Sequence, residues 1–137
     1  MNEISFQSKF LPGVIISVVW KEYSGYKKLK PLFKEYGFGF MVPKQNLVII
    51  DGEQIPESQD DMPYIYFIEA HEIAHIILNH DGPRNEQDEL DADYGAYILL
   101  NKHGMNKSVK LLLDTFNERH NKKFDINRVK ELENYFE

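Results

Sequence analysis

The amino-acid sequence predicts an α+β fold, in which a short, mostly antiparallel sheet from the N-terminal half packs on a buried helix and further C-terminal helices. Three observations lead to this prediction. The β-branched run "VIISVVW" at 14–20 is typical of a buried strand. Two apolar runs within 38–51 are joined by a polar Pro/Asn turn, which is typical of a β-hairpin. Apolar residues recur at helical spacing in the second half, so strands and helices are segregated rather than alternating.

Two long helices are expected after the hairpin. The first begins near Pro63 and stops before "DGP" at 81–83, and it is apolar on nearly every side, as a buried helix is. The second follows Asn85, which is expected to cap it, and ends at Gly104. These two helices carry most of the ionisable residues discussed below.

Shorter helices complete the predicted layout. One or two helical turns are expected on each side of Pro31, within the basic stretch "YKKLKPLFK", which we interpret as a solvated helix face. Amphipathic helices at 108–120 and 125–136 close the chain, and their apolar stripes are expected to pack against the core.

Composition narrows the class of protein. The chain has 137 residues, which suits one domain over 1–137, and its net charge of -6 argues against a direct nucleic-acid partner. There is no Cys, which excludes disulfides, thiolate catalysis and Cys-ligated zinc. The lack of Cys is compatible with the cytosol, and we expect a cytoplasmic protein. No apolar run is long enough to span a bilayer and no targeting segment is recognisable, so no membrane partner is expected.

The segment "FIEAHEIAHIILNH" at 67–80 places ionisable residues in an otherwise apolar helix. His71 and His75 lie about 40° apart around a helix, so their imidazoles can converge on one ion. Glu72 lies about 100° from His71, where it can reach a water on that ion. This is the H-E-x-x-H pattern of zinc sites. Zinc lowers the pKa of a bound water to about 7, and Glu72 would take the proton as the water attacks a carbonyl. The alternative is a hydrogen-bonded polar cluster without metal.

A catalytic zinc site typically has three protein ligands, so a third must come from elsewhere. In "DELDADYGAY", Glu89 and Asp93 are one helical turn apart on one face. We expect Glu89 to be the third ligand and Asp93 to accept the other ring N–H of a liganding histidine. The alternative is a solvated acidic face. Asp81 is a weaker candidate, because the pattern that uses this position needs a Gly where Leu78 stands.

Other polar residues of these helices are expected to lie off the site. Glu69 lies about 160° from His71, Asp91 about 200° from Glu89, and His80 is expected to be a helix C-terminal residue. A peptidase also needs a donor to the oxyanion besides the metal. The candidates for it are Tyr94, Tyr97, His103 and His120.

The two segments together resemble the ImmA/IrrE family of small zinc-peptidase-like proteins, within the gluzincins. The resemblance covers about 50–99 and includes Phe67 and Ala70 ahead of H-E-x-x-H, then Glu89-x-x-x-Asp93 with small residues beside it. It implies a zincin-like domain in which His71, His75 and Glu89 bind Zn²⁺ and Glu72 is the general base. It also implies that Asp93 supports the ligands, and that the strand "LVIID" at 47–51 lies at a sheet edge where an extended substrate can pair.

The resemblance implies a zinc-dependent endopeptidase of narrow specificity that cleaves a regulatory protein, such as a transcriptional repressor. Two alternatives stay open at this stage. The domain can be a non-proteolytic module that binds a regulator through a zinc-peptidase fold, or a protein in which zinc only holds two helices together. Glu72→Gln distinguishes the first alternative from the enzyme, because only the enzyme needs the carboxylate.

Overall fold

The computed structural model describes residues 2–42, 44–57, 61–80 and 84–137, and these form four strands and five α-helices. The α+β class predicted from the sequence is confirmed, because all four strands precede the long helices. The strands are β1 (Glu3–Gln7), β2 (Ile15–Val19), β3 (Gly39–Val42) and β4 (Leu47–Asp51). The helices are α1 (Tyr26–Tyr36), α2 (Asp61–Ile77), α3 (Glu86–Lys102), α4 (Asn106–His120) and α5 (Ile126–Leu132), with 3-10 turns at Gly52–Gln54 and Glu133–Phe136.

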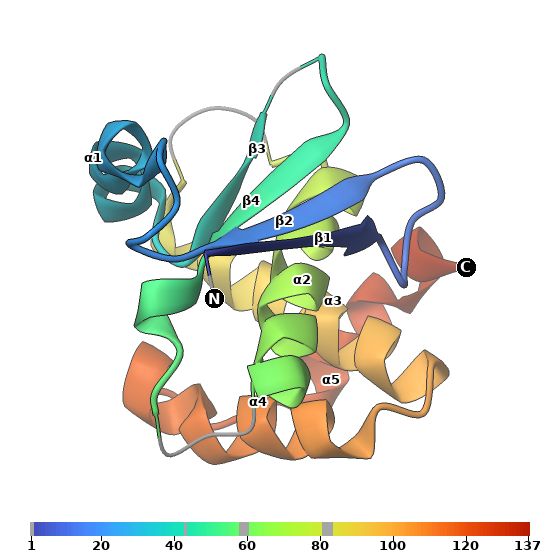
Figure 1. Cartoon of the computed structure of the whole chain (residues 1–137). Helices are drawn as coiled ribbons and strands as arrows, with labels where there is room; N and C mark the ends of the chain where they lie inside the picture. The colour runs from blue at the N-terminus through green and yellow to red at the C-terminus, as the bar shows by residue number, and fades with distance from the viewer. Residues whose placement is uncertain (1, 43, 58–60, 81–83) are drawn as a thin grey trace.

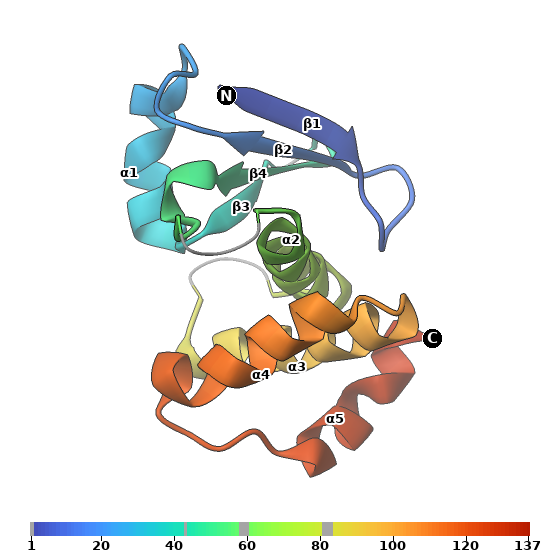
Figure 2. The same ribbon diagram turned by 60° about the horizontal axis from the view of Figure 1, so that its bottom comes forward.

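The helix α2 lies between the sheet and the helices α3, α4 and α5 (Figures 1 and 2), while α1 packs on the other face of the sheet, against residues such as Phe40 and Ile49. Because it is covered from both sides, α2 buries an unbroken run from Phe67 to His75, as its sequence predicts. The main core joins the inner face of the sheet to α2, α3, α4 and α5. Among the described residues, no helix combines the length and the apolar character that crossing a membrane requires.

The sheet has the strand order β1-β2-β4-β3 and is mixed. β1 pairs with β2 and β3 with β4 in antiparallel fashion, whereas β2 and β4 are parallel. The expectation that "LVIID" is an edge strand is therefore wrong, because β4 is hydrogen-bonded on both sides. Its central place explains its burial, with Val48 and Ile50 fully buried. The edge next to α2 is β3 instead.

Two local predictions also need correction. Pro31 does not divide the helix before the hairpin, because α1 runs as one helix of 11 residues through it. Proline removes one backbone hydrogen bond there, and the burial of Tyr26 and Phe33 on one face offsets that loss. The strand β1 was not predicted. Its signal is the alternation of Ile4 and Phe6 with polar neighbours, a half-buried pattern without the apolar run of β2.

The helices that carry the site begin and end close to the predicted residues. α3 starts after Asn85, whose side chain accepts a hydrogen bond from the backbone N–H of Asp88. α2 ends at Ile77, and Asn79 then adopts the left-handed conformation (φ 62°). A backbone hydrogen bond from His80 N–H to the carbonyl of His75 closes this end.

Glu69 anchors the β1–β2 connection to α2. One carboxylate oxygen, Oε2, accepts hydrogen bonds from the Ser8 hydroxyl (2.8 Å) and the Lys9 backbone N–H (2.7 Å). The other oxygen is buried and has no hydrogen-bond partner among the described residues. Burial raises the pKa of Glu69 to about 7, although the bonds to Ser8 and Lys9 act in the opposite direction. Glu69 thus lies away from the side of α2 that carries His71 and His75, as its helical position predicts.

The raised pKa of Glu69 predicts how stability depends on pH. Because the folded-state pKa lies above the unfolded one, the stabilising contribution is full below about pH 4.5 and is lost as the pH rises through about 7. Glu69→Gln keeps an acceptor oxygen for Lys9 and cannot ionise. We expect its free energy of unfolding, relative to the parent, to improve by about 2 kcal/mol between pH 5 and pH 8. Urea unfolding at both pH values measures this difference, and parallel pH curves for the two proteins would contradict it.

Candidate metal centre

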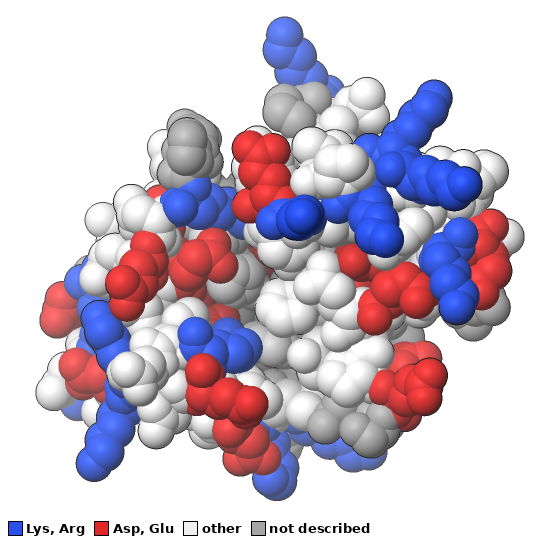
Figure 3. All heavy atoms as spheres, turned by 90° about the vertical axis from the view of Figure 1, so that its left-hand side faces the viewer, with Lys and Arg blue, Asp and Glu red and all other residues white. Residues whose placement is uncertain are grey.

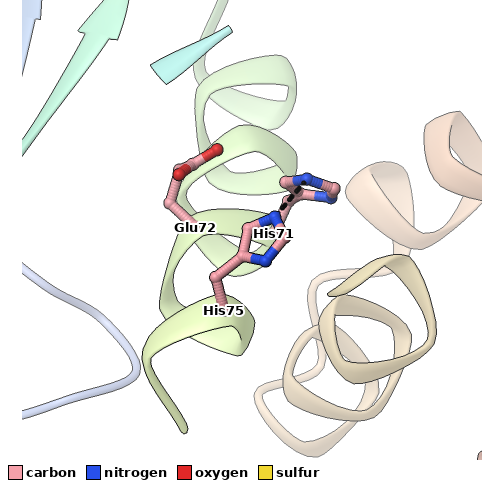
Figure 4. A group of neighbouring side chains, drawn as sticks. All are labelled: His71, Glu72 and His75. Atoms are coloured by element: carbon pink, nitrogen blue, oxygen red, sulfur yellow. Dashed lines mark hydrogen bonds between the residues drawn. The ribbon is translucent and has the colours of Figure 1, made fainter. Parts of the chain in front are cut away.

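Two imidazoles from consecutive turns of α2 meet on the side of that helix facing α3. The Nε2 atoms of His71 and His75 lie 3.1 Å apart, and both side chains are buried (Figure 4). The spacing of four residues explains the meeting, because it returns the helix to nearly the same side. Glu72 leaves α2 on the adjoining side, next to the two rings rather than between them (Figure 4).

The carboxylate of Glu89, from the first turns of α3, closes the group. Its Oε2 lies 3.2 Å from Nε2 of His71, and its Oε1 lies 3.0 Å from Nε2 of His75. A carboxylate oxygen of Glu72 and the ring nitrogens of both histidines also lie within 4.8 Å of one another. Both carboxylates are thus near the imidazoles, but only Glu89 approaches both Nε2 atoms directly. The structure therefore brings together the three residues that the sequence predicted as ligands.

The geometry of this group fits a metal ion. In a tetrahedral zinc site with metal–ligand distances of about 2.0–2.1 Å, neighbouring ligand atoms are about 3.3 Å apart. The observed separations between Nε2 of His71, Nε2 of His75 and the Glu89 oxygens are 3.0–3.2 Å. In addition, Oε1 of Glu89 is buried and makes no hydrogen bond of acceptable geometry to any described residue. A cation bound between Glu89 and the two imidazoles would give this oxygen a partner.

Asp93 holds His71 from behind, one helical turn after Glu89. Its Oδ1 lies 2.8 Å from Nδ1 of His71, which leaves Nε2 free to face Glu89. Its Oδ2 accepts hydrogen bonds from Arg119 and His120 of α4, and the carboxylate is fully buried. The expected partnership of Asp93 with a ligand histidine is thus present in the structure. The contribution of α4 was not expected.

His80 lies at the C-terminal end of α2, as expected, but the expectation that it lies off the site is wrong. Its Nδ1 lies 2.8 Å from Nδ1 of His75, and its Nε2 lies 3.6 Å from a carboxylate oxygen of Asp88. A helix that continued to position 80 would point His80 to the opposite side, but the left-handed Asn79 turns the chain back. Each of the two candidate ligand histidines therefore has an outer partner, Asp93 for His71 and His80 for His75.

We expect His80→Ala to weaken zinc binding about tenfold, because the Nδ1–H of His75 loses the acceptor that fixes its ring. Competition with a chromogenic chelator measures the affinity. His103→Ala is the matched control, since this exposed histidine bonds only to the Leu99 carbonyl within its own helix and should leave the affinity unchanged. Equal zinc affinities for His80→Ala and His103→Ala would show that His80 does not support the ligand.

Glu72 is buried and paired with Arg84. The Nη1 atom of Arg84 donates to Oε1 of Glu72 at 3.2 Å. The edge strand β3 lies on the other side of this carboxylate, because a Cβ placed on Gly39 would be 3.5 Å from Cγ of Glu72. Arg84 carries no helical or motif signal in the sequence, so its contact with Glu72 was not predicted. Glu72 thus lies between His71 and His75, an arginine and the face of β3 that points toward α2.

Burial and hydrogen bonding shift the pKa values of these groups in different directions. Burial lowers the pKa of His75 to about 3, so its imidazole is neutral, the form that binds a metal. Burial raises the pKa of Glu72. Burial alone would also raise those of Glu89 and Asp93, but hydrogen bonds from imidazoles outweigh it and hold both below their usual range. The same bonds outweigh the effect of burial on His71 and raise its pKa to about 10, so a metal must displace a proton there.

Three cavities surround the group. The largest, about 700 Å³, has His75 and Arg84 in its wall together with apolar residues of α1 and β3. A second, about 410 Å³, is lined by His71, Glu89 and His120 among others. A third, about 380 Å³, lies between Arg84, Glu89 and the C-terminal end of α1. The predicted ligands are therefore accessible from a cleft rather than sealed in the core.

Of the four residues considered as oxyanion donors, only His120 reaches a cavity beside the ligands. The hydroxyl of Tyr94 accepts a bond from the backbone N–H of Asp125, and Tyr97 packs on Phe124. His103 bonds to the Leu99 carbonyl. Arg119 lines the same cavity as His120, and sequence reasoning missed it because the contact joins α3 and α4.

Asp91 and Asp81 are two further acidic residues whose place relative to the site was considered. Asp91 faces away from the ligands, as expected, and its carboxylate is held by the guanidinium of Arg128. Asp81 lies outside the residues that the structure describes.

Comparisons of this chain with family models, with curated proteins and with solved structures found no match, so the inference about function depends on the arrangement of these side chains.

Proposed function

We propose that this protein is a zinc-dependent endopeptidase of narrow specificity that cleaves a regulatory protein, such as a transcriptional repressor. The observation that carries the proposal is the approach of the Glu89 carboxylate to Nε2 of both His71 and His75 within 3.0–3.2 Å. Two imidazoles and one carboxylate form the ligand set of peptidase-type zinc sites, which keep a further position open. Glu72 lies beside this set without belonging to it.

Each residue has a distinct role in this proposal. Bound zinc would supply the Lewis acid that polarises a water and the scissile carbonyl. Glu72 takes the proton of the attacking water and passes it to the leaving amine. Asp93 fixes the ring of His71 through Nδ1, and His80 does the same for His75. His120 and Arg119 line the cavity beside His71 and Glu89, where they can donate hydrogen bonds to charge that develops on the substrate oxygen.

The resemblance of "FIEAHEIAHIILNH" and "DELDADYGAY" to the ImmA/IrrE family supports the same assignment, and a zincin-like fold belongs to the proposal. Narrow specificity is supported by the partly enclosed cavities around the proposed ligands. A regulatory substrate is the part of the proposal that follows from the resemblance alone.

The test combines metal analysis with a search for cleavage products. The purified parent protein is expected to contain one zinc per chain, and Glu89→Gln is expected to lose it. A peptide mixture prepared from a cell extract is then incubated with the parent, with the chelator-treated parent and with Glu72→Gln. New peptide termini are expected with the parent alone. Termini that appear equally in all three samples would refute the proposal.

A second candidate function is a non-proteolytic module that binds a regulator, and the contact between Arg84 and Glu72 favours it. A guanidinium on the carboxylate occupies an oxygen that a general base needs. In that case Glu72→Gln keeps its binding partner and its biological effect, and Arg84→Ala produces no cleavage. If Arg84→Ala cleaves peptides faster than the parent, the same contact restrains an active enzyme instead.

A further inference from the structure

The strand β3 presents two residues with unpaired backbone groups at the edge of the sheet. The backbone N–H of Asp51 donates to the carbonyl of Phe38, which makes these opposite residues a hydrogen-bonded pair. Such pairs alternate along an antiparallel ladder, so Phe40 and Val42 also point their polar groups toward β4. Gly39 and Met41 therefore point theirs outward, and no other described strand pairs with this side. An extended peptide can bond to both.

Of the two outward-facing residues, Gly39 lies closer to the proposed reaction centre than Met41. Gly39 stands beside Glu72, as the 3.5 Å approach of its position to Cγ shows. Met41 is two residues further, about 7 Å along the strand, where it lines the cavity of about 700 Å³ together with Ile76 and Asn79. A bound strand that passes Glu72 must therefore also pass this cavity.

The direction of the bound strand decides which of its residues meet the cavity. Antiparallel pairing is the more stable choice per residue, and it reverses the order of residues opposite β3. The peptide residues opposite Met41 and Val42 then precede the residue opposite Gly39. Consequently, the cavity receives side chains from the N-terminal side of the bond beside Glu72.

The wall of this cavity is apolar where α1 contributes to it. Leu29, Leu32 and Tyr36 lie on one side of α1 and line the cavity together with Met41 and Val42. Their spacing of three and four residues makes them a single stripe on the helix. The sequence had suggested only a solvated basic face here, yet this stripe is left partly uncovered rather than packed away. Large aliphatic or aromatic side chains fit such a wall.

The outer surface of α1 is positively charged, unlike the chain as a whole. Residues 21–36 contain five lysines and two glutamates, whereas the whole chain has a net charge of -6. Lysine and arginine side chains gather on the upper part of the face shown in Figure 3, over α1. Lys28 precedes the cavity residue Leu29, and Lys34 lines the neighbouring cavity with Arg84. An acidic partner is therefore attracted to this wall.

We propose that the cleft binds an extended segment of another protein that adds antiparallel to β3, with bulky apolar residues just N-terminal to the bond beside Glu72 and acidic residues further upstream. The apolar side chains occupy the cavity between α1, β3 and α2, and the acidic residues face the lysines of α1. The inference rests on the proposed peptidase function only for the position of the bond. The binding itself is a separate property.

Binding is tested with the zinc-loaded Glu72→Gln protein, which cannot consume its ligand. The probe is a fluorescein-labelled peptide with Asp-Asp-Leu-Phe ahead of Ser-Ala, followed by anisotropy. Peptides with Ser-Ser in place of Leu-Phe, or with the same residues in reverse order, are expected to bind at least about tenfold more weakly. If the Leu-Phe peptide and the Ser-Ser peptide bind with equal affinity, the apolar part of the inference is overturned. Equal affinity for the forward and reversed peptides would overturn the direction.

Charge variants of exposed lysines test whether α1 recognises the acidic part of the peptide, and they do not disturb the core. Lys28→Glu combined with Lys34→Glu is expected to weaken binding of the acidic peptide about tenfold, and the loss should shrink as salt increases. The matched control is Lys107→Glu with Lys130→Glu, which makes the same charge change on exposed positions of α4 and α5. Leu32→Ser probes the apolar stripe in the same assay. If the test pair and the control pair weaken binding equally, α1 does not recognise the peptide.

Cleavage by the parent protein separates this inference from the proposed function. Sites cut in a peptide mixture are expected to be rich in Leu, Phe or Met just before the bond and in Asp or Glu further upstream. Cleavage without this preference, or with a preference only after the bond, overturns the inference and leaves the peptidase function standing. If the Glu72→Gln protein binds the peptide selectively but the parent protein cleaves nothing, the peptidase function is refuted and the peptide-binding site is retained.

Discussion

Replacing Glu72 with Gln is expected to lower the rate of peptide cleavage by about 10²–10⁴ while zinc remains bound. The amide fills the same space but cannot accept the proton of the attacking water. The proposed ligand atoms of His71, His75 and Glu89 do not include this side chain, and they contact one another directly at 3.0–3.2 Å. The fall should therefore appear in kcat, measured as the rate of appearance of new peptide termini.

The control for this prediction is Glu118→Gln, which changes the same functional group at an exposed position of α4. It should cleave at the parental rate. Metal analysis of all three proteins establishes whether zinc is retained. A Glu72→Gln protein that keeps both its zinc and the parental rate would show that the carboxylate is not the base.

Replacing Asp93 with Ala is expected to destabilise the fold by about 3–5 kcal/mol, the largest stability effect predicted for this chain. Asp93 is fully buried and bonds to His71, Arg119 and His120. Its removal leaves a guanidinium and two imidazoles without their shared anion in the interior between α2, α3 and α4. Urea unfolding of the zinc-free protein measures this cost separately from any effect on the metal.

The zinc affinity of the Asp93→Ala protein should also be about 10–100-fold lower than that of the parent protein, because the ring of His71 loses the partner at Nδ1. Asp114→Ala is a suitable control, since Asp114 makes an exposed pair with Lys110 within α4. Its removal should change stability by less than about 0.5 kcal/mol. An Asp93→Ala protein as stable as Asp114→Ala would show that the buried carboxylate is not needed to balance its neighbours.

Features of the site that follow from one helix, or from two helices with clear ends, could be predicted from the sequence. The convergence of His71 and His75 is a consequence of helical geometry alone. Glu89 and Asp93 could be assigned because Asn85 defines where α3 begins, and thereby which residues share a face. The apolar character of α2 predicted its burial between two layers.

Features that depend on a single backbone conformation or on distant pairing could not be predicted. The position of His80 depends on one left-handed residue, Asn79, and a continued helix would have placed His80 on the opposite side. The central place of β4 depends on its parallel pairing with β2, across the intervening α1 and β3. Neither periodicity nor composition distinguishes a central strand from an edge strand of this length. Arg84 and Arg119 reach the site only through tertiary contacts.

The free edge of β3 also bears on self-association. An unpaired strand edge is a template on which a second copy of the same chain can pair and begin aggregation. Here the edge spans only four residues, and one of its walls is α1, whose exposed lysines would face those of an approaching identical copy. Like charges repel at such short range, so the edge disfavours a copy of itself while remaining open to an acidic strand.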